Sequence, residues 1–65
     1  MNKDILEGKW KEAKGTVRAK WGELTDDEVD QVAGNRERLE GLVQQKYGKT
    51  KEAAKQEVDA FIDAL

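Results

Sequence analysis

Apolar residues recur along the chain at the three- and four-residue spacing of amphipathic helices. The first five of these large or small apolar residues, from Leu6 to Trp21, are separated by four, three, four and four positions. This spacing predicts one long helix over residues 3–21, which Gly22 closes in the left-handed conformation. The inward face of this helix consists of Leu6, Trp10, Ala13, Val17 and Trp21.

A short second helix is indicated by its capping residues. Thr25 is followed three positions later by Glu28, which is the spacing of a capping box. The acidic residues between them suit the positive end of a helix dipole. We therefore predict a helix over residues 26–33 that ends at Gly34, with an inward face made of Val29, Val32 and Ala33.

The second half of the chain predicts two more helices. Asn35 is a suitable N-cap for a helix over residues 36–47 that ends at Gly48, and Thr50 caps a fourth helix. The inward residues of the third helix are Leu39, Leu42, Val43 and Lys46 or Tyr47. Those of the fourth are Ala54, Val58, Phe61, Ile62 and Leu65.

The six glycines form two triplets, each with a spacing of seven, and the second triplet repeats the first at an offset of 26. Eight of the 39 positions that overlap at this offset are identical, and the words KWG and KYG coincide. The pattern indicates a possible internal duplication, with one helical hairpin in each copy. The triplets are Gly8, Gly15 and Gly22, and Gly34, Gly41 and Gly48.

The connections between the predicted helices are short, and the chain has no proline and no low-complexity stretch. We therefore expect an all-α fold: a single compact four-helix domain over residues 1–65, built from two crossed helical hairpins. With 65 residues, no cysteine and no histidine, the domain must rely on packing, because disulfides and structural zinc are ruled out.

Charge is divided unevenly along the chain. Residues 1–22 carry six basic and three acidic groups, whereas residues 23–34 carry five acidic groups and no basic one. One interpretation is that the acidic block complements its own helix dipole and attracts the lysines of the first helix. The other is an interaction surface on the first helix, made of Lys9, Trp10, Lys14 and Lys20.

The two tryptophans allow a similar choice. They could be core anchors, or they could be stacking platforms on a basic surface. The core is favoured, because both lie on the same stripe as Leu6 and Val17. The net charge of −2 argues against general nucleic-acid binding, although the first helix could still present a local basic patch. We expect a protein partner or an anionic membrane surface rather than nucleic acid.

No enzymatic chemistry is indicated by the residue types. The chain has no histidine, cysteine or serine, and its threonines have no histidine base to activate them. We predict no catalytic residue, no cofactor and no metal site. The first residues carry acidic groups and no long apolar run, so we expect no signal peptide or transmembrane anchor, and a cytoplasmic monomer.

Three longer words carry a resemblance that spans nearly the whole chain. They are GKWKEAKG at 8–15, KWGELTDDE at 20–28 and QQKYGKTKEAAKQEV at 44–58. The sequence resembles the CsbD-like family of small bacterial stress-response proteins. The resemblance implies a four-helix fold akin to the SAM-domain-like class and a cytoplasmic role in general stress. It implies no catalytic residue, ligand or cofactor to assign here.

Two functions therefore compete for a non-enzymatic protein. One is a hydrophilic protectant of other cell components, and the other is a partner-binding, membrane-surface or nucleic-acid-binding module that uses the basic first helix. The glycines add a prediction about stability. Gly8, Gly15 and Gly41 fall inside the predicted helices, nearly opposite the apolar stripes, so their replacement by alanine is expected to stabilise the fold.

Overall fold

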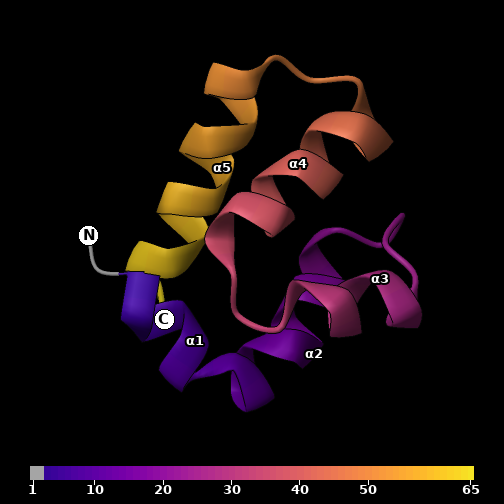
Figure 1. Cartoon of the computed structure of the whole chain (residues 1–65). Coiled ribbons are helices and arrows are strands. Elements are labelled where there is room, and N and C mark those ends of the chain that lie inside the picture. The colour runs from indigo at the N-terminus through magenta and orange to yellow at the C-terminus, as the bar shows by residue number, and fades with distance from the viewer. Residues whose placement is uncertain (1–2) are drawn as a thin grey trace.

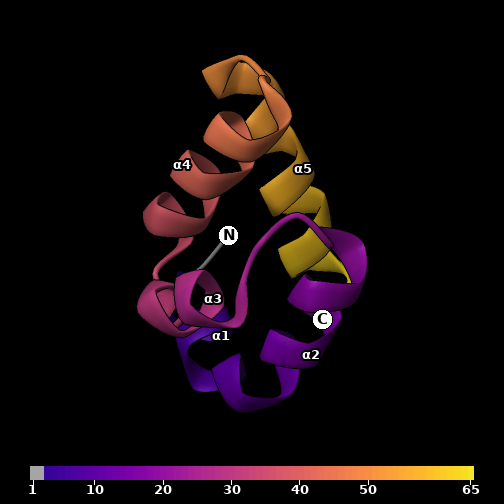
Figure 2. The same cartoon turned by 90° about the vertical axis from the view of Figure 1, so that its right-hand side faces the viewer.

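The regular structure of the chain is entirely helical in the computed structural model, which describes residues 3–65. The five helices are α1 Lys3–Gly8, α2 Trp10–Lys20, α3 Asp26–Val32, α4 Arg36–Tyr47 and α5 Lys51–Asp63. The α4 and α5 helices lie side by side as a hairpin, and α1, α2 and α3 pack around its lower end (Figures 1 and 2). The all-α prediction is confirmed, and residues 1 and 2 of the expected domain lie outside the described part.

The predicted first helix is wrong in one respect, because it is two helices instead of one. The chain leaves helical geometry at Lys9, which has φ −107° and ψ 14° and acts as the N-cap of α2 without a side-chain hydrogen bond. The carbonyl of Lys9 accepts the first bond of α2, from the N–H of Ala13 at 2.8 Å. Gly8 precedes this break, and glycine is a poor helix former. The described chain therefore has five helices where four were expected.

The start of α3 agrees with the sequence, but its end does not. The capping box is present: the N–H of Thr25 donates to Glu28 at 2.9 Å, and the N–H of Glu28 donates to the Thr25 hydroxyl at 3.1 Å. The helix ends at Val32, and Ala33 follows as its C-cap in the left-handed conformation with φ 48°. Ala33 is consequently exposed and does not belong to the inward face that the sequence predicted.

The later caps follow the predictions. Asn35 accepts a hydrogen bond from the N–H of Arg38 at 3.2 Å, and Thr50 accepts one from the N–H of Ala53 at 3.1 Å. Gly48 closes α4 with φ 63°. The prediction that Gly22 closes the first helix in the left-handed conformation is wrong. The C-cap of α2 is Trp21, with φ −119°, and Gly22 is not among the residues with positive φ.

The core consists of the predicted apolar stripes with few changes. Trp21 is 2% exposed and packs edge-on against Phe61, with ring centroids 5.2 Å apart, so it is a core residue. Trp10 is half-buried against the same core. The buried set is Leu6, Ala13, Val17, Trp21, Leu24, Val29, Val32, Leu39, Val43, Ala54, Val58, Phe61 and Ile62.

Three residues in and around the core differ from the sequence prediction. Lys46 and Tyr47 were alternatives for the inward face of α4, but both are exposed. The hydroxyl of Tyr47 instead accepts a hydrogen bond from the N–H of Glu23 in the α2–α3 loop. Leu24 in that same loop is buried although it belongs to no helical stripe. The α2–α3 loop is therefore part of the packed structure.

The offset of the glycine repeat also separates the starts of α2 and α4, but not their ends. The N-caps of α2 and α4, Lys9 and Asn35, are 26 positions apart, as in the repeat, whereas the C-caps Trp21 and Gly48 are 27 apart. The internal duplication and the SAM-like crossed hairpins stay predictions.

Candidate functional site

The four residues of the predicted interaction surface are spread along α2. Lys9 lies exposed at the α1–α2 junction, and Trp10 begins α2. Lys14 is exposed near the middle of the helix, and Lys20 is its last residue. At 1.5 Å per residue, the first and last residues of α2 are about 15 Å apart along the axis. Only Lys9 and Trp10 are direct neighbours.

Two of these lysines already have partners within the fold. The Lys14 ammonium pairs with Asp30 of α3 at 2.5 Å, and the neighbouring Arg18 pairs with Asp26 of the same helix. The Lys20 ammonium lies 5.4 Å from the centroid of the Trp21 ring, within the range of a cation–π contact. The acidic block therefore does attract the basic groups of the first helix region, as one of the two interpretations of the charge pattern proposed.

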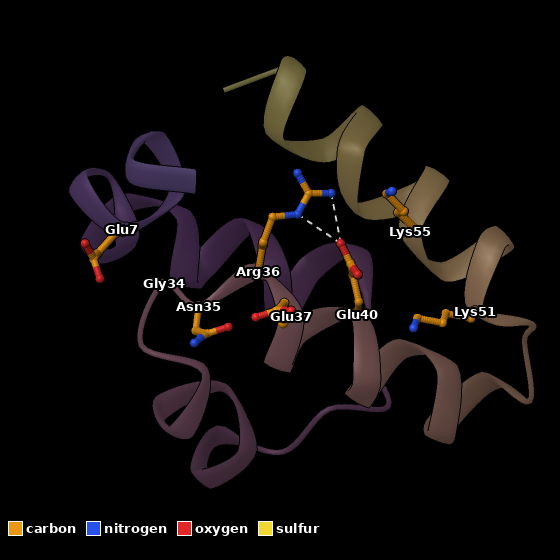
Figure 3. A pocket seen from close by; sticks show the side chains of 8 residues that line it. All are labelled: Glu7, Gly34, Asn35, Arg36, Glu37, Glu40, Lys51 and Lys55. Carbon is orange, nitrogen blue, oxygen red and sulfur yellow. Dashed lines mark hydrogen bonds and ion pairs between the residues drawn. The ribbon is translucent and has the colours of Figure 1, made fainter. Parts of the chain in front are cut away.

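A polar groove lies on another part of the molecule, where α1, the α3–α4 turn, α4 and α5 meet (Figure 3). Its volume is about 630 Å³. Three acidic and three basic side chains contribute to the lining, so the groove has no net preference for anions or cations. The lining residues are Glu7, Gly34, Asn35, Arg36, Glu37, Glu40, Lys51 and Lys55.

Arg36 is the most constrained side chain in this groove. Its Nε donates to Glu40 at 2.9 Å, and its Nη2 pairs with Asp59 of α5. The hydrogen bond to Asp59 is the main reason that the pKa of Arg36 is raised, and Glu40 adds to the effect against partial burial. The guanidinium charge is thus already neutralised inside the fold. Its role in the structure is to join α4 to α5.

The groove offers little for catalysis. Its lining contains no hydroxyl, thiol or imidazole group, so it supplies none of these nucleophiles for catalysis. Within residues 3–65, no group of three His, Cys, Asp or Glu side chains is placed to hold a metal ion. The arrangement can bind small polar molecules through charge pairs and hydrogen bonds.

Two further carboxylates join elements that are distant in the sequence. Glu57 of α5 accepts a hydrogen bond from the indole N–H of Trp21 at 3.1 Å and pairs with Lys49, and these bonds, with Lys49 first, lower its pKa. Glu28 of α3 pairs with Lys46 at 2.8 Å, which is the main cause of its lowered pKa. Both groups hold helices together.

Sequence reasoning missed Arg36 and Glu57 as connecting residues. The i, i+4 spacing of Arg36 and Glu40 was available as a signal, since that spacing places opposite charges together on a helix. No local pattern points to Asp59, which is 23 positions from Arg36, or to Trp21, which is 36 positions from Glu57.

No helix among residues 3–65 has the length and apolar character needed to cross a bilayer.

Comparison with known proteins gives a consistent result over most of the chain. Residues 4–56 match the family described as CsbD-like. The chain is 59% identical to a UPF0337 protein of Bordetella pertussis over 63 residues, which cover 97% of this chain and 96% of that protein. It is 46% identical to a UPF0337 protein of Pseudomonas aeruginosa, with all of both chains covered.

A UPF0337 protein of Bdellovibrio bacteriovorus is 53% identical over 62 residues, which cover 95% of this chain and 67% of that longer protein. No solved structure matches the chain significantly. The family match and the extent of the identities leave a clear assignment: the chain belongs to the CsbD-like family.

Proposed function

We propose that this protein is a non-enzymatic stress-response protein that protects other cell components, and that it acts as a cytoplasmic monomer. The observation that carries the proposal is the separation of charge from the core. Charged residues make up 40% of the chain, and no polar or charged residue among those described is buried. Membership of the CsbD-like family supports a role in stress.

The charged surface is also held in place by ion pairs between elements. Lys14 and Arg18 of α2 pair with α3, Lys46 of α4 pairs with α3, and Arg36 of α4 pairs with α5. Each pair is partly exposed and contributes little by itself. Together these pairs give the surface around the small core charged side chains of both signs, which favours solubility and hydration at high protein concentration.

The test is protection during drying. A labile test enzyme is dried and rehydrated alone, with this protein, and with an equal mass of serum albumin, and its remaining activity is measured. We expect this protein to preserve more activity than albumin does. Equal or lower recovery with this protein would reject the protectant function.

A second candidate, binding to an anionic membrane surface, is favoured by the α1–α2 junction. Lys9 is exposed there, Trp10 is only half-buried, and Ile5 is 40% exposed. A basic group beside accessible apolar groups is the pattern that binds anionic lipid surfaces. Lys14 contributes less than the sequence suggested, because Asp30 already holds it.

Tryptophan emission separates this candidate from the protectant function. Vesicles that contain phosphatidylglycerol should shift the emission of Trp10 to the blue, and high salt should reverse the shift. The variant Lys9→Glu should abolish the shift, whereas Lys55→Glu, on α5, should retain it. An unchanged spectrum at low salt would exclude the membrane candidate. Nucleic acid would be indicated instead by retention on DNA that weakens steeply with salt.

A further inference from the structure

The two longest runs of uncharged residues in the chain come together in the fold. In a sequence with 40% charged residues, only 31–35 and 41–45 extend over five positions without a charge. The first run covers the end of α3 and the turn after it, and the second lies in α4. Between these two helices is a groove of about 330 Å³ (the helices are seen in Figure 2). Its lining is Gln31, Val32, Arg38, Gly41, Leu42 and Gln45.

The floor and walls of this groove are largely apolar. Leu42 is half-buried and packs on the core, so the rest of its side chain is exposed in the groove. Val32 beside it is fully buried. A Cβ atom placed on Gly41 would meet nothing within 4 Å, so an approaching group can come close to the α4 backbone. Depletion of charge around an apolar centre is typical of the buried part of protein interfaces.

The polar groups of the lining restrict the chemistry of the partner. Gln31 and Gln45 carry amides, which both donate and accept hydrogen bonds and so match peptide groups. Arg38 supplies the single charge of the lining, and no carboxylate is part of it. One guanidinium nitrogen of Arg38 donates to the carbonyl of Gln31 at 2.9 Å, which fixes the side chain at the rim. Its other N–H groups can bind a carboxylate.

We propose that this α3–α4 groove is a docking surface for a short acidic and apolar segment of another protein. An apolar side chain of the partner packs on Leu42 beside Gly41, its peptide groups bond to Gln31 and Gln45, and an aspartate or glutamate pairs with Arg38. The volume lies at the lower end of the range of about 300–1,000 Å³ that is usual for binding pockets, which suits one or two side chains. This docking is separate from protection during drying, and either test can fail without the other.

The glycine repeat provides a matched pair of variants. Gly41→Glu places a carboxylate in the groove, where it repels an acidic partner. Gly15→Glu makes the same change at the corresponding position of α2, where a Cβ atom also has nothing within 4 Å. Both substitutions replace glycine in a helix by a better helix former, so both proteins are expected to fold at least as well as the parent.

The experiment uses the full chain labelled with ¹⁵N and a short blocked peptide of leucine, alanine and glutamate as the probe. We expect chemical-shift changes centred on Gln31, Gly41, Leu42 and Gln45. Gly41→Glu should weaken binding by about tenfold or more, and Gly15→Glu should leave it within about twofold of the parent. A matched peptide with lysine in place of glutamate should bind more weakly.

Four results would overturn the proposal. One is shift changes that lie elsewhere or do not occur, and a second is an equal loss of binding in the two variants. The third is equal binding of the lysine peptide. The fourth is binding of decanoate to this groove without binding of the acidic peptide, because that would assign the groove to a fatty acid instead of a protein segment.

Discussion

Gly8 and Gly34 occupy equivalent positions in the repeat, yet only one of them is required by its surroundings. Each directly precedes the N-cap of a long helix. A Cβ atom on Gly8 would meet nothing within 4 Å. A Cβ atom on Gly34 would lie 2.6 Å from the Cα of Glu7, and Gly34 also has φ 84°. The backbone of α1 therefore packs directly on Gly34. The contact is made by Glu7, the residue that precedes Gly8.

The N-caps that follow the two glycines differ in the same direction. Asn35 has extended geometry and bonds to the N–H of Arg38, whereas Lys9 makes no side-chain cap. The α3–α4 junction is thus specified by side-chain chemistry and by close packing, and the α1–α2 junction by neither. Equivalent positions in a repeated sequence can therefore differ in how strongly capping and packing constrain them.

The largest expected effect comes from Gly34→Ala. Alanine at φ 84° is strained, and its methyl group would collide with the backbone of Glu7, which cannot move without displacing α1. We expect a loss of about 2–4 kcal/mol in the free energy of unfolding, measured by urea denaturation followed by circular dichroism. Gly48→Ala is the control, because φ is 63° there but the space is open, and it should cost about 1 kcal/mol. Equal losses would show that the Glu7 contact carries no weight.

The caps provide the next test. Asn35→Ala removes the hydrogen bond at the start of α4 and should destabilise the protein by about 1 kcal/mol. Lys9→Asp places a negative charge at the start of α2, where the helix dipole favours it, and should stabilise the protein by up to about 1 kcal/mol. Thermal melts of both variants measure the difference. A loss of stability in Lys9→Asp would mean that the lysine itself has a structural role at the junction.

Gains of no more than this size are expected where a helical glycine has open space. Gly15→Ala and Gly41→Ala, both inside helices, should each raise the free energy of unfolding by up to about 1 kcal/mol. Gly8→Ala should give less, because Gly8 is the last residue of α1. Chemical denaturation of the three variants measures and ranks their free energies of unfolding. A melting point lowered by Gly8→Ala would show that the break before α2 needs glycine.

The smallest effect concerns the other ends of α2 and α4, which Glu57 joins through Trp21 and Lys49. These contacts lower the pKa of Glu57 from its ordinary value of 4.5. They therefore stabilise the fold fully above pH 4.5, and the contribution is lost as the pH falls through the lowered pKa. Glu57→Gln should reduce stability at pH 7 and flatten its decline on acidification, as followed by melting temperature. A Glu57→Gln variant whose melting temperature falls with pH as steeply as that of the parent would reject this role of Glu57.

The sequence predicted those parts of the fold that depend on neighbouring residues. Three of the expected helices, their N-caps and the left-handed Gly48 are found, because capping and amphipathic spacing act over a few positions. The break at Lys9 was missed, since the stripe from Leu6 to Val17 runs across it without interruption. That break is associated with packing of α1 on Gly34, a contact between residues 27 positions apart in the sequence.

The candidate site was predicted less well for the same reason. The sequence indicated that the acidic block attracts the lysines of the first helix, but periodicity does not show that Asp30 and Trp21 are the partners of Lys14 and Lys20. The uncharged runs that form the α3–α4 groove are visible in the sequence, and only the fold shows that they meet.

The contact between Glu7 and Gly34 also has a consequence for protein synthesis. The ribosome makes α1 before any other described element, yet the glycine on which α1 rests follows 27 residues later. At about 5–20 residues per second, that delay is about 1–5 s. The first helix of the nascent chain thus emerges without its docking partner, and its apolar residues Ile5 and Leu6 stay without that packing during this interval.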